Sequence, residues 1–146
     1  MNDSRFAPLR LTLANEEEFS AFAASFARRL RPGDVVALSG PVGSGKTAFV
    51  RAIVRTLHGN DQSCSPSFTF RHRYDGDPAI EHLDFFRIDD PRELPELGLE
   101  EAFDGHSIAL VEWWRNAPDA IPPRRYEIEI TGAGDEPRAL SLRLAQ

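Results

Sequence analysis

Residues 40–47 carry the residue types from which a phosphate-binding loop is built. They read Gly-Pro-Val-Gly-Ser-Gly-Lys-Thr and match the pattern G-x-x-x-x-G-K-[ST]. The glycines let the backbone curl until successive amides face inward toward phosphate oxygens, and the following helix adds its positive end. Lys46 is expected to bridge β- and γ-phosphate oxygens, while the Thr47 hydroxyl ligates magnesium. The segment therefore predicts an ATP and Mg²⁺ site, contacted by Gly40, Val42, Gly43, Ser44, Gly45, Lys46 and Thr47.

Lys46 is also the only lysine of the chain. The other 16 of the 17 lysine and arginine residues are arginines. A compact ammonium reaches between phosphate oxygens, where the broad planar guanidinium fits less well. The choice of lysine at this one position supports the phosphate-binding interpretation of the loop.

A phosphate-binding loop also needs an acidic residue on a neighbouring strand to hold the metal, and two carboxylates qualify. Glu112 ends the apolar run 108–111, so its side chain is expected to emerge beside the loop. Asp84 lies between large apolar residues that could exclude water. Each could instead be a solvated carboxylate at a strand end. Lys46, Asp84 and Glu112 are the candidate catalytic residues.

Three further features have competing interpretations. Residues 65–69 read Ser-Pro-Ser-Phe-Thr, which is either a hydroxyl-bearing loop that approaches the γ-phosphate or an ordinary turn. Trp113 and Trp114 either cover the nucleotide or a partner, or pack at the core and its rim. The four histidines lack metal-ligand spacing, and no metal is assigned to them.

The hydrophobic pattern predicts which elements position these residues. Helical spacing follows a capping pattern at Asn15 and continues after the loop to His58, with a shorter helical segment ending near Phe103. Apolar runs at 35–38 and 108–111 predict buried strands. Alternation at 9–13, 68–74, 80–86, 126–130 and 140–144 predicts further strands, most of them in antiparallel hairpins. We therefore expect one P-loop NTPase-like α/β domain over residues 1–146, with flanking helices and a mixed sheet. The strands before Gly40 and Glu112 form its parallel centre.

Composition narrows the function classes. At 146 residues with a formal net charge of -6, the chain has room for one core and lacks the basic balance of a protein that tracks nucleic-acid phosphates. It contains no apolar run of bilayer length and no export signal behind its first residue. Its single cysteine, Cys64, fits a reduced compartment. These observations favour a cytoplasmic location and no membrane contact.

In order and spacing, these segments resemble the TsaE (YjeE) family, the ATPase of bacterial tRNA threonylcarbamoyladenosine synthesis. The resemblance covers nearly the whole chain. Besides the P-loop, it rests on Ser-Pro-Ser-Phe-Thr at 65–69, His-Leu-Asp-Phe-Phe-Arg at 82–87, Asp-Pro-Arg-Glu-Leu at 90–94, Leu-Gly at 97–98 and Leu-Val-Glu-Trp at 110–113.

The resemblance implies roles for individual residues. In that family the P-loop threonine and the glutamate of the Glu-Trp pair hold magnesium, which implies these roles for Thr47 and Glu112. The aspartate of the His-x-Asp motif lies at the nucleotide site, which implies that role for Asp84. Contacts from the N-terminal segment and the last hairpin imply Glu16, and Glu136 or Arg138. The chain departs from the family pattern in having Ser67 for Thr, Phe86 for Tyr and Trp114 for Pro.

The resemblance also implies an activity and partners. The family acts as an accessory ATPase on the TsaB–TsaD protein complex, which modifies tRNA, and ATP hydrolysis to ADP resets that complex. Contact with tRNA would then be indirect. Two alternatives stay open. A small-molecule kinase would need an acceptor pocket and an Arg-rich lid, and a nucleotide-dependent interaction module would hydrolyse almost nothing.

Overall fold

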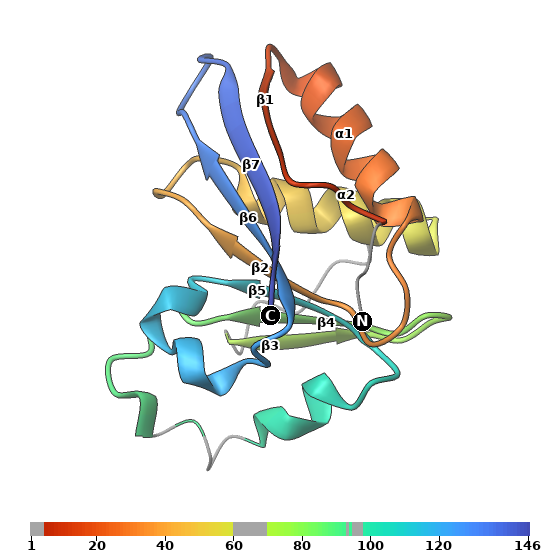
Figure 1. Cartoon of the computed structure of the whole chain (residues 1–146), viewed down its shortest axis with the longest axis vertical. Coiled ribbons are helices and arrows are strands. Elements are labelled where there is room, and N and C mark those ends of the chain that lie inside the picture. Colours follow the sequence, from red (N-terminus) through yellow and green to blue (C-terminus); the bar gives the residue numbers. More distant parts are fainter. Residues whose placement is uncertain (1–4, 60–69, 93, 95–97) are drawn as a thin grey trace.

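The computed structural model describes residues 5–59, 70–92, 94 and 98–146, and its architecture is a mixed sheet with helices on it (Figure 1). The strands are β1 (Leu9–Leu13), β2 (Val35–Ser39), β3 (Arg71–Tyr74), β4 (Ile80–Asp84), β5 (Ile108–Glu112), β6 (Arg125–Thr131) and β7 (Arg138–Ala145). The helices are α1 (Glu16–Arg28) and α2 (Lys46–His58), with short 3-10 helices η2 (Leu99–Phe103), η3 (Trp114–Asn116) and η4 (Pro118–Ala120).

The seven strands pair in the order β1-β7-β6-β2-β5-β4-β3. The pairs β6–β2, β2–β5 and β5–β4 are parallel, and the outer pairs β1–β7, β7–β6 and β4–β3 are antiparallel. The predicted mixed α/β fold with a parallel centre is confirmed. That centre is wider than the two strands expected, because one strand of each predicted hairpin also joins it in parallel.

The sheet separates two apolar clusters, and strand β5 contributes residues to both. Ile108 and Leu110 belong to the larger cluster beneath α1 and α2, and Val111 belongs to the cluster that includes Leu99 of η2 and Trp114 of η3. Since successive strand residues point to opposite faces of a sheet, the two clusters lie on opposite faces. Glu112 comes two residues after Leu110 and therefore shares the face covered by α1 and α2.

The helix ends follow the capping signals of the sequence. The Asn15 side chain accepts a hydrogen bond from the Glu18 amide (2.9 Å), and the Glu18 carboxylate accepts one from the Ala14 amide (2.8 Å). The carboxylate therefore reaches one residue further back than in a capping box. Helix α2 is capped by Gly45 before its first residue and by Gly59 after its last, and both glycines have left-handed backbone.

One expectation has a different outcome, and another is not tested by the described residues. The helical segment that ends at Phe103 is a five-residue 3-10 helix, and the left-handed Gly98 precedes it. The hydroxyl-bearing segment 65–69 lies outside the described residues. None of the helices in the described ranges has both the length and the apolar character needed to cross a membrane.

Candidate nucleotide-binding site

The loop between β2 and α2 has the backbone that its glycines predict. Gly40, Gly43 and Gly45 have φ of +146°, +83° and +111°, a region that favours glycine. A Cβ on Gly40 would lie 2.0 Å from the carbonyl oxygen of Ile130 in β6, whereas one on Gly43 would meet nothing within 4 Å. Close contact with β6 therefore holds the start of the loop in place, while its middle is open.

Lys46 is buried inside this loop. Its Nζ donates to the carbonyl oxygens of Gly40 (2.7 Å) and Pro41 (3.0 Å) and lies 4.5 Å from the centre of the Trp113 ring. Burial lowers the pKa of the ammonium, and the carboxylates of Glu112 and Asp84 oppose that shift. The ammonium is thus held within the loop by two neutral carbonyl oxygens, which anionic phosphate oxygens can replace as hydrogen-bond acceptors.

Thr47, at the start of α2, contacts Glu112, at the end of β5. The Thr47 Oγ1 lies 3.0 Å from Oε1 and 3.1 Å from Oε2 of Glu112, and His82 Nε2 lies 2.6 Å from Oε2. The carboxylate is 2% exposed. A hydroxyl and a carboxylate side by side are hard oxygen donors, the kind that Mg²⁺ prefers.

Asp84 lies beside Glu112 in register on the neighbouring strand. Its carboxylate is half-buried and accepts a hydrogen bond from the Phe86 amide (2.9 Å). Burial and the charge of Glu112 raise the pKa of Asp84, although the Phe86 amide, His82 and Lys46 act in the opposite direction. Lys46, Thr47, Asp84 and Glu112 all line one cavity of about 360 Å³, together with Val42, Gly43, Gly45, Ala48, Phe86 and Trp113.

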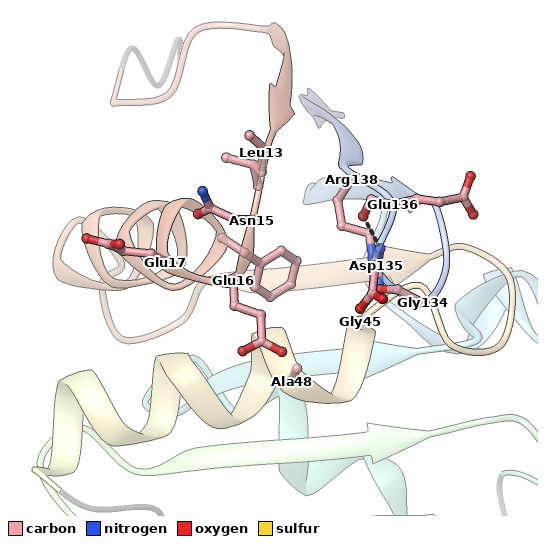
Figure 2. A pocket seen from close by; sticks show the side chains of 12 residues that line it. Leu13, Asn15, Glu16, Glu17, Gly45, Ala48, Gly134, Asp135, Glu136 and Arg138 are labelled. Carbon is pink, nitrogen blue, oxygen red and sulfur yellow. Dashed lines mark hydrogen bonds between the residues drawn. The ribbon is translucent and has the colours of Figure 1, made fainter.

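A second cavity, of about 510 Å³, lies among the starts of α1 and α2 and the β6–β7 turn (Figure 2). Gly45 and Ala48 border both cavities. Figure 2 shows the Glu16 side chain directed toward Ala48. The volume of this second cavity falls in the range of small-molecule sites, and its position beside the P-loop suits the nucleoside part of a nucleotide.

Arg138 ties the β6–β7 turn to the P-loop. Its Nε donates to the Ser44 carbonyl oxygen (2.8 Å), and its guanidinium also donates to the carbonyls of Glu136 (2.6 Å) and Gly134 (3.1 Å). The carboxylate of Glu136 points away from this cavity (Figure 2). Of the two hairpin candidates, Arg138 is the one whose side chain reaches the loop.

The loop and its acidic neighbours fit a magnesium nucleotide. The buried Ser44 Oγ has no hydrogen-bond partner in the described part of the chain. Within the same residues, no three His, Cys, Asp or Glu side chains gather closely enough to hold a metal by themselves. Mg²⁺ usually takes one or two protein ligands and completes its shell with water and substrate phosphates, so a Thr47–Glu112 pair is a sufficient protein contribution.

Comparison with known proteins identifies the relatives of this arrangement. The family model for the threonylcarbamoyl adenosine biosynthesis protein TsaE matches residues 13–140. The chain belongs to the TsaE family.

TsaE relatives match over most of their length. The TsaE protein of Bacillus subtilis is 37% identical over 134 residues, which are 91% of this chain and 84% of that protein. TsaE of Rickettsia typhi is also 37% identical over 134 residues, covering 90% of this chain and 92% of the relative. The crystal structure of Bacillus subtilis YdiB superposes with a TM-score of 0.80 at 33% identity, covering 96% of this chain and 87% of YdiB.

Two of the three residues expected to depart from the family pattern lie in the described part of the chain. Phe86 is 52% exposed, and its ring centre lies 4.9 Å from that of Trp113. Trp114 is buried in the smaller apolar cluster, with the Arg125 guanidinium 4.4 Å from its ring centre. Trp114 therefore packs in the core, whereas Trp113 lies over Lys46. Ser67 is outside the described residues.

One buried partner of the site in this TsaE-family chain is not predicted by its spacing. His82 is hydrogen-bonded to Glu112, although the spacing of the histidines indicates no metal ligand. The signal was its place two residues before Asp84, because strand alternation puts both side chains on the same face of β4.

Proposed function

We propose that the chain is an ATP-hydrolysing accessory protein that acts on the TsaB–TsaD complex in threonylcarbamoyladenosine modification of tRNA. The observation that carries the proposal is the Lys46 ammonium set inside a glycine loop, next to a Thr47 hydroxyl in contact with the buried Glu112. Membership of the TsaE family supports the pathway.

The residues of the loop would bind the phosphates. Lys46 exchanges its bonds with the Gly40 and Pro41 carbonyls for bonds with phosphate oxygens, and the loop amides and the start of α2 attract the same anion. Arg138 holds the Ser44 end of the loop in place from the β6–β7 turn. These contacts position the triphosphate without covalent chemistry.

The two carboxylates would divide the remaining work. Thr47 and Glu112 would hold Mg²⁺, and the bound ion would supply positive charge to neutralise the negative charge developing on the phosphate oxygens. Asp84 lies across from Glu112 on the cavity wall, where it can orient the attacking water or the γ-phosphate. Glu16 lines the second cavity, from which it would contact the nucleoside part of the nucleotide.

Dependence on partners follows from the open site. Both cavities reach the surface, and phosphoryl transfer to water needs an ordered nucleophile shielded from bulk solvent. We therefore expect slow turnover by the isolated chain and faster turnover when TsaB–TsaD closes the site. The net charge of -6 favours contact with tRNA through these partners rather than directly.

A phosphate-release assay tests the proposal and its alternatives. Purified chain is incubated with Mg²⁺ and ATP, alone and with TsaB–TsaD, and Lys46→Ala serves as the inactive control. We expect slow release alone, stimulation by the pair, and none from the variant. Release that requires a small-molecule acceptor would indicate a kinase. Nucleotide-dependent docking with no release under either condition would indicate an interaction module.

A further inference from the structure

The buried carboxylate of Glu112 depends on two donors. It is 2% exposed, and a buried carboxylate is costly unless hydrogen bonds satisfy it. Its side-chain hydrogen-bond partners among the described residues are Thr47 Oγ1 and His82 Nε2. Glu112 is the last residue of the otherwise apolar strand β5, and these two side chains hydrogen-bond its end group.

The two donors differ in which oxygen of the Glu112 carboxylate they contact. The Thr47 hydroxyl carries one proton and lies almost equally far from both oxygens, at 3.0 and 3.1 Å, so it does not select between them. His82 lies 2.6 Å from Oε2 alone. The histidine therefore fixes which oxygen faces β4 and leaves Oε1 to the Thr47 side.

His82 contacts the site through Glu112, the carboxylate to which it is hydrogen-bonded. It is 8% exposed and lies opposite Leu110 in the β4–β5 register, two pairs before the Asp84–Glu112 pair. It does not line the cavity that contains Lys46 and Thr47. An effect of His82 on magnesium binding therefore does not require direct contact between His82 and a nucleotide in that cavity.

We infer that His82 is a positioning residue that holds the Glu112 carboxylate in the orientation used to bind magnesium. The inference rests on the proposed function and adds to it a residue behind the metal ligands. Partners of this kind orient a metal ligand and keep it basic, and their loss typically costs about 10–100-fold in metal affinity.

The test measures binding rather than turnover. Binding of ADP carrying a fluorescent N-methylanthraniloyl group is titrated against Mg²⁺ for wild type, His82→Leu and His82→Gln. Leucine removes the donor and fills the space, while the glutamine amide can still donate. For His82→Leu we expect the Mg²⁺ concentration at half-maximal binding to rise about 10–100-fold, with Mg²⁺-free ADP affinity unchanged. His82→Gln should lie between that variant and wild type.

Two controls separate positioning from a general structural effect. His72 lies opposite His82 on β3, with ring centres 6.1 Å apart, and His72→Leu should leave the Mg²⁺ requirement unchanged. In a Glu112→Gln background, His82→Leu should have no further effect on that requirement, because the ligand it orients has lost its charge.

The outcomes distinguish a failure of the inference about His82 from a failure of the proposed function. An unchanged Mg²⁺ requirement in His82→Leu would overturn the inference alone, as would an equal shift in the Glu112→Gln background. If His82→Leu fails to fold, an unshifted requirement in His82→Ala, checked for folding by urea titration, would overturn the inference equally. Wild-type protein that binds no ADP at any Mg²⁺ concentration would overturn the proposed function and the inference with it.

Discussion

Replacement of Gly40 by alanine should destabilise the fold far more than the same change at Gly43. Both glycines have positive φ, +146° and +83°, so an alanine at either position costs about 1–3 kcal/mol of backbone strain. Only at Gly40 does the new methyl meet other atoms. It would lie 2.0 Å from the Ile130 carbonyl oxygen and 2.8 Å from Ser44 Oγ.

The size of the difference follows from that contact. The carbonyl belongs to the backbone of β6 and cannot rotate away, so either the loop or the strand must move. Overpacking of this kind costs about 1–3 kcal/mol beyond the strain, which gives roughly 2–6 kcal/mol for Gly40→Ala. Against a typical total stability of about 5–15 kcal/mol, this loss is large.

Urea unfolding, followed by tryptophan fluorescence, measures both variants. Gly43→Ala should lower the free energy of unfolding by about 1–3 kcal/mol with an unchanged denaturant slope. Gly40→Ala should lower it further or prevent folding. Equal losses in the two variants would refute the claim that close contact with β6 fixes the start of the loop.

Three further predictions concern the site and its surroundings. Glu112→Gln should weaken the Mg²⁺ dependence of ATP binding, whereas Asp84→Asn should leave Mg²⁺-ATP binding nearly intact and lower single-turnover hydrolysis. The reverse pattern in titrations and quenched-flow assays would mean that the two roles are exchanged. Arg138→Ala should weaken nucleotide binding by about tenfold, the weight of one charge-assisted hydrogen bond, and unchanged affinity in calorimetry would rule out its support of the loop. Burial opposes ionisation of Glu127, but hydrogen bonds from two arginines outweigh it and hold its pKa below the ordinary 4.5. The stability it contributes is present above pH 4.5 and is lost as the pH falls through the lower folded-state pKa. Urea titrations should therefore show Glu127→Gln less stable than wild type at neutral pH, with a gap that closes in acid; a gap independent of pH would contradict this.

Much of the fold could be predicted because local patterns and tertiary contacts agree. The apolar runs before Gly40 and Glu112 became the paired central strands β2 and β5, and the glycine loop lies between a strand and a helix as the motif requires. The capping pattern at Asn15 placed the start of α1. These features depend on residues close together in the sequence.

The remaining features depend on contacts between distant residues. The parallel pairing of β6 with β2 brings Ile130 against Gly40, and no local pattern encodes that neighbour. The contact between His82 and Glu112 joins residues 30 positions apart. Arg138 was distinguishable from Glu136 only once the direction of each side chain at the β6–β7 turn was known.

ATP titration of the Lys46→Ala variant tests the central claim most directly. On ATP binding the ammonium would exchange its two hydrogen bonds with loop carbonyls for bonds with phosphate oxygens, and no other lysine exists to replace it. A hydrogen bond to a charged group is worth about 1.5–3 kcal/mol. Arg51→Ala removes an exposed cation from the same helix and serves as the matched control. The account predicts that calorimetry with Mg²⁺-ATP gives a loss of about 100-fold or more for Lys46→Ala and wild-type affinity for Arg51→Ala. Equal affinity in wild type and Lys46→Ala would contradict the nucleotide site itself.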